Sequence, residues 1–323
     1  MNQSPHGQVT PPRLEQLLPP LKAESLQCLH RFMRYKPVPF PLTLPKRRRA
    51  AVAIILFVGR LGDLYVLLST RAGNMRSYAS DTALPGGKAE DGDLNSEGTA
   101  RREAYEEIGL PIDSEKVLCL CTLDIFLAGN GLLVTPVVLL VTDHTLNPIL
   151  NPAEVTHLFS MPLASFLHVH PSKIPGWHFG LKDRSAPFIP TEARPALTVP
   201  EPPPIRYALD EGVVGGKEGY YQYRDIKWGS GIVRMHRFLT GKEGQGIRPV
   251  YGLTAGILVH AAVIGYNSPT EFRRFAPNQP DMFARIHWEI TNGNGPLTRA
   301  VQVEGLWDEW KGSDISQAPK AKL

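Results

Sequence analysis

Three glutamates with the spacing of a cation site stand in the middle of the chain, at Glu103, Glu106 and Glu107. In an α-helix these are positions i, i+3 and i+4, so the three carboxylates share one face. Carboxylates this close repel one another, and each tends to hold a proton unless a cation lies among them. Mg²⁺ prefers oxygen ligands and keeps room for water and phosphate oxygens. The spacing therefore favours a divalent-cation site, and a solvated acidic helix face is the alternative.

The residues around the glutamates narrow these alternatives. Pro85-Gly86-Gly87 precedes them and forms a turn that lets the backbone approach a phosphate closely. Arg102 stands beside the first glutamate and has two possible roles, to orient a glutamate or to bind a phosphate with both arms of its guanidinium. Gly109 follows the last glutamate and is typical of a helix end. A phosphate-facing metal site thus fits the segment better than a plain acidic surface.

Leu84 to Leu110 resembles the box of the Nudix family, in which a glycine and an acidic residue precede R-E-x-x-E-E-x-G and an aliphatic residue. Asp93 takes the upstream acidic position, and one extra residue separates it from Arg102. The resemblance implies an α+β fold, an α/β/α sandwich with a mixed sheet. It also implies hydrolysis of a nucleoside diphosphate linked to another moiety. Glu103 and Glu107 would bind Mg²⁺, or Mn²⁺, with Glu106 assisting, and the general base is left open.

Residues upstream and downstream of the box are similar to the coenzyme A diphosphatase branch, although Ser80 and Leu84 depart from the signature that this branch carries before its box. The similar segments are 67–71, 84–87, 134–138, 151–155 and 251–255. Arg71 and Arg76 would bind substrate phosphates together with Gly86 and Gly87, and ordinary surface arginines are the alternative. Glu154 would approach the metal as a ligand or base, and an exposed glutamate at a helix start is the alternative. With Arg102, Glu106 and Glu107 it completes the expected catalytic set.

The resemblance implies cleavage of coenzyme A or acyl-CoA into adenosine 3′,5′-bisphosphate and (acyl-)4′-phosphopantetheine. Two other functions stay open. One is hydrolysis of a different nucleoside diphosphate derivative, such as ADP-ribose, NADH or a dinucleoside polyphosphate. The other is a non-catalytic binding protein on the same scaffold. The preference for free, acylated or oxidised coenzyme A and the oligomeric state are not readable from the sequence.

Apolar patterns predict the elements that position these residues. Runs at 50–58 and 64–69 predict a hairpin, and those at 117–126 and 132–141 predict another. The sequence predicts helices at 21–35, 96–108, 161–169 and 253–265, and strands at 220–226 and 232–238. We expect an N-terminal arm and helix over 1–45, the catalytic domain over 46–268, and a C-terminal extension over 269–323. The Pro- and Gly-rich segment 171–218 is expected to be an inserted loop.

The composition of the 323-residue chain is that of an ordinary globular protein, with a formal net charge of +4. Such a mild basic excess suits an anionic small molecule, and no nucleic acid is expected as partner. No apolar run is long enough to span a membrane. Ala321-Lys322-Leu323 resembles a peroxisomal address, so a peroxisomal import receptor is the expected partner and the peroxisome the expected location, with the cytoplasm as the alternative.

Overall fold

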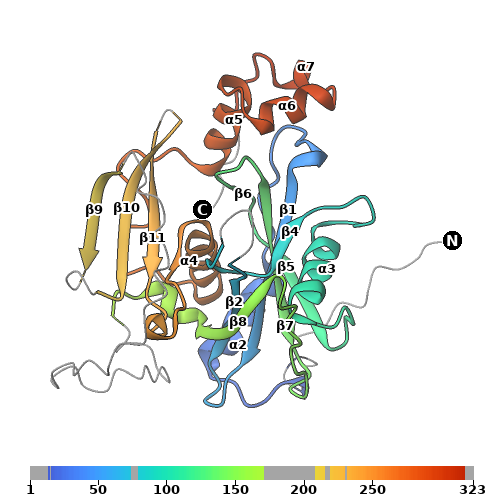
Figure 1. Ribbon diagram of the computed structural model, residues 1–323, viewed down its shortest axis with the longest axis vertical. Helices are drawn as coiled ribbons and strands as arrows, with labels where there is room; N and C mark the ends of the chain where they lie inside the picture. Colours follow the sequence, from blue (N-terminus) through green and yellow to red (C-terminus); the bar gives the residue numbers. More distant parts are fainter. Residues whose placement is uncertain are drawn as a thin grey trace.

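The computed structural model describes residues 14, 16–73, 79–170, 208–214, 219–229 and 231–316. Within them the chain forms an eight-stranded mixed sheet and a separate four-stranded antiparallel sheet, with helices between and around them (Figure 1). The expected α+β architecture is therefore confirmed. No helix in these ranges is both long enough and apolar enough to cross a membrane.

The mixed sheet is built around β1 (Arg49–Val58), which runs parallel to β7 and antiparallel to β2 and β4. Its other strands are β2 (Leu64–Arg71), β3 (Thr82–Ala83), β4 (Gly86–Lys88), β5 (Val117–Thr122), β6 (Phe126–Leu127), β7 (Leu133–Val141) and β8 (Val155–Pro162). The hairpin expected over 50–69 is present as β1 and β2. In the second expected hairpin, β5 and β7 pair antiparallel, and β6 forms a short extra strand on the same partner.

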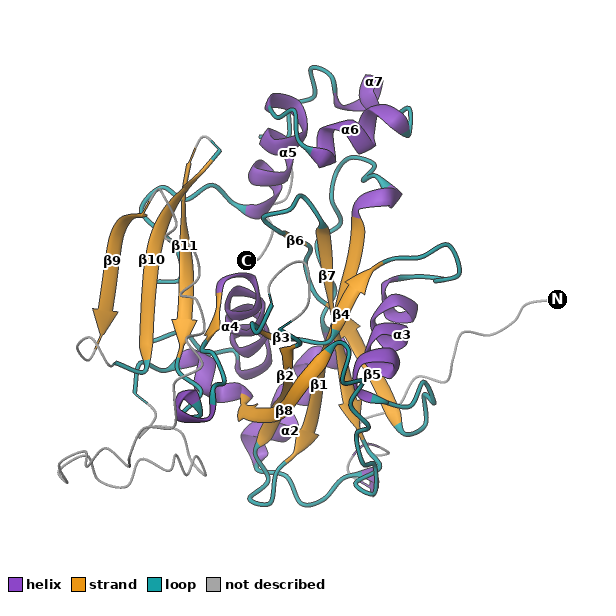
Figure 2. Cartoon of the chain, in the orientation of Figure 1, coloured by secondary structure: helices purple, strands orange, loops and turns teal. Residues whose placement is uncertain are grey.

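Helices cover both faces of this sheet, as Figure 2 shows. Helix α3 (Ser96–Ile108) packs on one face, where Ala100, Ala104 and Ile108 bury against the small and branched side chains of β1. Helices α2 (Ala23–Arg34) and α4 (Gly252–Tyr266) lie on the other face and contact each other. Helix α4 is apolar on every side because it is enclosed between the mixed sheet and the second sheet.

Local signals set both ends of α3. The side chain of Asn95 accepts a hydrogen bond from the backbone N–H of Gly98 at 3.0 Å, which caps the first turn. Gly109 ends the helix in the left-handed conformation at φ 66°, and its N–H donates to the Tyr105 carbonyl. The helix thus begins and ends at the residues that the sequence predicts.

The second sheet corrects one expectation. It is formed by β9 (Ala208–Val214), β10 (Tyr221–Trp228), β11 (Gly231–Phe238) and β12 (Val250–Tyr251). Strand β9 lies inside segment 171–218, which was expected to be a loop throughout, and it pairs antiparallel with β10. The Pro- and Gly-rich composition of the segment concealed a strand whose hydrogen-bond partners come from β10.

Two further elements differ from the expectation. Strand β8 was not expected, because its sequence Val155–Pro162 alternates poorly and follows a Pro-containing turn. It pairs with β2 along most of its length. The helix expected over 161–169 is a short 3-10 helix, η2 (Leu163–Leu167), since residues 161 and 162 end β8.

Residues near the two ends of the described chain pack together. Helices α5 (Met282–Asn292), α6 (Pro296–Val303) and α7 (Trp307–Trp310) form a cluster at the top of Figure 1. The indole of Trp310 donates to the Thr43 carbonyl at 2.9 Å, and the Glu304 carboxylate accepts from the backbone N–H groups of Lys46 and Arg47 in the 3-10 helix η1 (Lys46–Arg48). A short 3-10 helix, η4 (Glu243–Gln245), precedes β12. The boundaries at 45 and 269 stay a prediction.

Candidate active site

The three glutamates of α3 differ sharply in burial. The side chain of Glu107 is 5% exposed and faces the sheet, that of Glu103 is 15% exposed, and that of Glu106 is 49% exposed. Their spacing does place them side by side, as expected. Because an α-helix advances about 100° per residue, however, only part of the shared face points into the protein. Glu103 and Glu107 are therefore the inner pair, and Glu106 lies at the outer edge.

The glycine turn is built around these two inner carboxylates. The carboxylate of Glu103 lies directly against the α-carbon of Gly87, so that a β-carbon at this position would overlap it. The backbone N–H of Gly86 donates to the carboxylate of Glu107. A β-carbon on Gly86 would also collide with the backbone of β1, with which β4 pairs. Both glycines thus allow β4 and α3 to approach closely at the point where the carboxylates meet.

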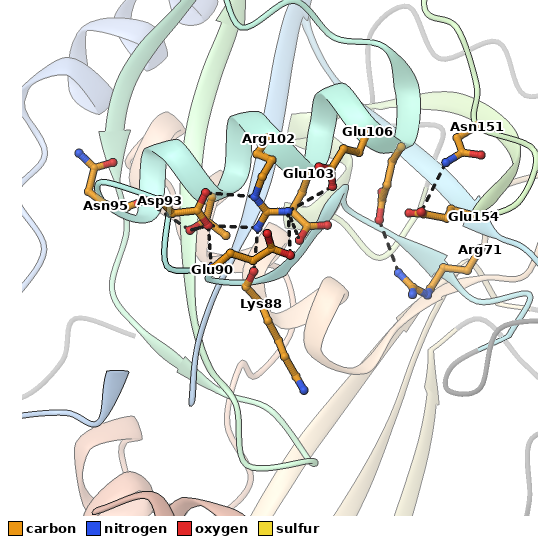
Figure 3. A network of polar contacts seen from close by, with 12 residues as sticks. Arg71, Lys88, Glu90, Asp93, Asn95, Arg102, Glu103, Glu106, Asn151 and Glu154 are labelled. Carbon is orange, nitrogen blue, oxygen red and sulfur yellow. Dashed lines mark hydrogen bonds and ion pairs between the residues drawn. The ribbon is translucent and has the colours of Figure 1, made fainter. Parts of the chain in front are cut away.

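Arg102 holds the outer end of the site (Figure 3). Its guanidinium forms two hydrogen bonds with Asp93, at 3.0 and 3.1 Å. The other three go to Glu103 at 3.0 Å, to Glu106 at 3.1 Å and to the Lys88 carbonyl at 2.9 Å. A guanidinium has five N–H donors, so all are used. Of the two roles that the sequence left open, the geometry favours orienting the glutamates over binding a phosphate.

The same contacts set the charge of Asp93. The hydrogen bonds from Arg102 lower the pKa of Asp93 to about 2, so its carboxylate stays ionised. Thr99 adds a hydrogen bond from its hydroxyl to Asp93 at 2.9 Å. The acidic residue that the sequence placed upstream in the motif is therefore an anchor for Arg102 and, through it, for Glu103.

The two inner carboxylates hold their protons more tightly than free glutamates do, although Arg102 lies beside Glu103 and Arg71 beside Glu107. Burial raises the pKa of Glu107 to about 8, and repulsion from Glu103 and Glu154 adds to this effect. Burial likewise raises the pKa of Glu103. Within the described ranges no three acidic, cysteine or histidine side chains already surround one point as a complete metal cage. Two buried carboxylates that repel each other nevertheless fit Mg²⁺, which commonly takes one or two protein carboxylates and completes its shell with water and phosphate.

Arg71 and Glu154 approach this pair from β2 and from the turn before β8 (Figure 3). A terminal nitrogen of Arg71 lies 3.7 Å from a Glu107 oxygen, and its Nε is buried with no hydrogen-bond partner. Glu154 is held by its own turn, where Asn151 donates to its carboxylate at 3.4 Å. The Glu154 carbonyl accepts from the Ala72 N–H at 2.7 Å, which fixes the turn to the end of β2. Arg76 lies outside the described residues.

A cavity of about 690 Å³ opens beside the site. Arg71, Gly86 and Gly87 line it together with residues of β10, β11, α5 and the first half of α4. Most of the wall is apolar. It contains Trp228 and Arg285, which sequence analysis missed, because a single tryptophan or arginine outside a motif carries no local signal. The cavity is large enough for a nucleotide-sized ligand.

Comparison with known proteins gives the family. The model of the NUDIX domain matches residues 47–179. The chain is 36% identical over 140 residues to the uncharacterized Nudix hydrolase NudL of Photorhabdus laumondii, covering 72% of that protein and 43% of this chain. This chain belongs to the Nudix family. The matched range includes α3 and its glutamates, whose roles in the site stay a prediction. Nudix hydrolases generally need a divalent metal ion, in agreement with the fit of Glu103 and Glu107.

Two other relatives of this Nudix protein extend the comparison. It is 34% identical over 235 residues to "Nudix hydrolase 15, mitochondrial" of Arabidopsis thaliana, and the aligned part covers 72% of this chain and 64% of the relative. It is 36% identical over 168 residues to "Peroxisomal coenzyme A diphosphatase 1" of Saccharomyces cerevisiae, and the aligned part covers 43% of this chain and 49% of the relative. The chain thus spans between about half and two thirds of the length of these two relatives.

Proposed function

We propose that this Nudix protein is a Mg²⁺-dependent diphosphatase that hydrolyses coenzyme A or acyl-CoA. Water would cleave the diphosphate bond and give adenosine 3′,5′-bisphosphate and (acyl-)4′-phosphopantetheine. The observation that carries the proposal is a pair of carboxylates, Glu107 buried and Glu103 largely so, held against the glycine turn beside a large, mostly apolar cavity. Such a pair has little structural benefit without a cation, because its burial and mutual repulsion are unfavourable.

In this proposal Glu103 and Glu107 hold the metal, and Glu106 assists from the outer edge. When bound, Mg²⁺ or Mn²⁺ would neutralise charge on the diphosphate oxygens. Arg102 keeps Glu103 in place through its hydrogen bonds to that residue and to Asp93. Gly86 and Gly87 let the strand approach the carboxylates, and their direct contact with substrate stays a prediction.

Arg71 is the residue we propose to bind the diphosphate. Its buried Nε has no hydrogen-bond partner, and it lines the cavity next to Glu107. A guanidinium in this position fits two phosphate oxygens at once. Arg76 is proposed to assist on the strength of the motif alone.

Glu154 is the general base that we favour. It lies close enough to Glu103 and Glu107 to raise the pKa of both, yet it has no cationic partner among the described residues. Glu106, by contrast, is engaged by Arg102. Glu154→Gln should therefore lower kcat by about 10²-fold or more, whereas Glu106→Gln should have a smaller effect. Equal losses in both variants would contradict this assignment.

The proposed substrate rests on similarity and on the cavity. Relatives from yeast, mouse and worm are named peroxisomal coenzyme A diphosphatases, with 34–36% identity over 36–43% of this chain. The apolar wall of the cavity suits the pantetheine arm, which has few charges. The experiment is incubation with Mg²⁺ and a panel of coenzyme A, acetyl-CoA, ADP-ribose, NADH and diadenosine tetraphosphate, with product identification by mass spectrometry. Faster cleavage of any of the last three would reject the proposed substrate.

The same experiment also tests whether the protein has a non-catalytic role. If wild type and Glu107→Gln gave the same background rate with every substrate, the protein would be a binding protein on the Nudix scaffold. The expected result is that Glu107→Gln abolishes activity that wild type shows.

We also propose that the protein is located in the peroxisome. The yeast, mouse and worm relatives are named peroxisomal, whereas the Arabidopsis relatives are named mitochondrial and chloroplastic. The import receptor would bind Ala321-Lys322-Leu323, which lies outside the described residues. A fluorescent protein fused before residue 1 should co-localise with a peroxisomal marker, and removal of residues 321–323 should release it to the cytoplasm. Mitochondrial fluorescence, or fluorescence unaffected by the removal, would contradict the proposal.

A further inference from the structure

A buried arginine, which has no acidic partner among the described residues, lines the same cavity. Arg285 of α5 is only 8% exposed, and its Nε is buried with no hydrogen-bond partner. Among the described residues no carboxylate forms an ion pair with it, and burial alone lowers its pKa to about 10. Burial of a charge is costly unless an opposite charge compensates it. A cation kept here therefore indicates an anion that the described part of the chain does not supply.

A second arginine in the same cavity has its charge compensated by a carboxylate. The side chain of Arg234 in β11 is 6% exposed, and it forms two hydrogen bonds with Asp225, at 2.8 and 2.7 Å. These bonds raise the pKa of Arg234, in the opposite direction from that of Arg285. Among the described residues, therefore, Arg234 has an acidic partner and Arg285 has none.

The position of Arg285 is fixed from two sides. Its guanidinium carbon lies 4.6 Å from the ring centre of Trp228 in β10, which is a cation–π contact. At the start of α5 the sulfur of Met282 accepts a hydrogen bond from the Leu127 N–H at 3.2 Å and so attaches the helix to β6. Stacking on the ring occupies one face of the guanidinium and leaves its N–H edge for a ligand. Arg285 and Trp228 line the same cavity as Arg71 and Gly87.

We propose that Arg285 binds a phosphate monoester of the substrate, separate from the diphosphate that is cleaved. The inference rests on the proposed function, because in coenzyme A this group is the phosphate on the 3′-oxygen of the ribose. The planar fork of an arginine matches phosphate oxygens in bidentate fashion. Since Arg71, to which the diphosphate is assigned, and Arg285 line one cavity, a second phosphate of the same molecule would be held by Arg285. Helix α5 thereby selects nucleotides with an additional phosphate.

Binding of the nucleotide product tests this assignment without hydrolysis. We would measure adenosine 3′,5′-bisphosphate and adenosine 5′-monophosphate by titration calorimetry. Wild type should prefer the bisphosphate by about 10- to 100-fold, the gain expected from a charge-assisted hydrogen-bond pair. Arg285→Met should lose this preference and bind the monophosphate as wild type does, and Arg285→Lys should keep part of it. Equal or undetectable binding of the bisphosphate by wild type, or a preference that survives Arg285→Met, would overturn the proposal.

Arg299→Met is the matched control, because Arg299 is an exposed arginine of α6 outside the cavity. It should keep the wild-type preference. Without ligand, Arg285→Met should also melt at a temperature equal to or above that of wild type, since it removes an unpaired buried charge. A lower melting temperature together with weaker binding of both nucleotides would show a purely structural role and reject the proposal.

Hydrolysis separates failure of this inference from failure of the proposed function. With coenzyme A and dephospho-coenzyme A as substrates, wild type should favour coenzyme A in kcat/KM, and Arg285→Met should reduce the ratio to near one. If neither compound were cleaved while the preference for the bisphosphate held, the proposed function would fail and the phosphate site would stand. If coenzyme A were cleaved with the same ratio in both proteins, the phosphate site would fail and the proposed function would stand.

Discussion

Gly87→Ala should inactivate this Nudix protein while leaving its fold intact. A β-carbon at Gly87 would lie 2.5 Å from the carboxyl carbon of Glu103. Ordinary van der Waals contact between such carbons begins near 3.5 Å, so the carboxylate would have to move by about 1 Å. Gly87 does not have a positive φ angle, so alanine is compatible with the backbone itself. The strain therefore falls on the Glu103 carboxylate.

A displacement of this size is large for a catalytic group. A misplacement of about 1 Å can cost roughly 10²-fold in rate, and we expect kcat to fall by about that factor. The Mg²⁺ concentration for half-maximal activity should rise as well, because Glu103 is a proposed ligand. The assay is steady-state hydrolysis of coenzyme A over a range of Mg²⁺ concentrations, together with circular dichroism and thermal unfolding.

Gly92→Ala is the control for this variant. Gly92 lies in the same connection between β4 and α3, but a β-carbon there would meet nothing within 4 Å. Its activity and metal dependence should match those of wild type. If Gly87→Ala retained kcat within a factor of three, or if both variants lost activity equally, the close packing of Gly87 and Glu103 would not be what positions the metal ligand.

Three further predictions concern the charges of the site. Arg102→Lys keeps the charge but loses the five-donor fork, so kcat should fall by about 10- to 100-fold with little change in unfolding temperature; activity within twofold of wild type would refute the positioning role. Burial raises the pKa of Glu107 from near 4.5 to about 8, so the folded protein binds a proton more tightly than the unfolded chain does. With a chelator present to remove metal, wild type should therefore lose stability as the pH rises from 4.5 through 8. One pKa unit corresponds to about 1.4 kcal/mol, so the loss in the free energy of unfolding is at most about 5 kcal/mol. Urea unfolding at pH 5 and pH 9 should show this loss in wild type, and an equal loss in Glu107→Gln would contradict the prediction. At pH 8 Mg²⁺ should raise the melting temperature of wild type but not of Glu107→Gln, and identical shifts in both proteins would place the metal elsewhere.

The sequence determined α3 and its glutamates almost completely. The start at Asn95, the end at Gly109 and the spacing of the carboxylates all act within one or two turns of helix, where short-range geometry governs the structure. The same holds for β1 and β2, whose apolar runs are long and joined by a short turn. Strands β8 and β9 were missed because their pairing partners, β2 and β10, rather than their own sequences, stabilise them.

The sequence also left open what Arg102 does. Its neighbours in the chain allowed both a glutamate-orienting and a phosphate-binding role, and only the approach of Asp93 and the Lys88 carbonyl showed that its donors are already used. Likewise, the three glutamates looked equivalent until the packing of α3 on the sheet buried Glu107 and left Glu106 half exposed. Spacing fixes which side chains are neighbours on a helix, but burial depends on what the helix packs against.

What the sequence by itself determined is therefore the local chemistry: a cation-binding helix, a glycine turn and the strands that carry them. Only the tertiary structure decided where the substrate cavity lies, because its walls come from segments as far apart in the chain as Arg71, Trp228 and Arg285. Local patterns report the periodicity of apolar residues, whereas the meeting of distant segments depends on the packing of the whole core. In the sequence the exposed Arg299 of α6 cannot be told from the buried Arg285 of α5. The charge of an arginine indicates a binding site only once its surroundings are known.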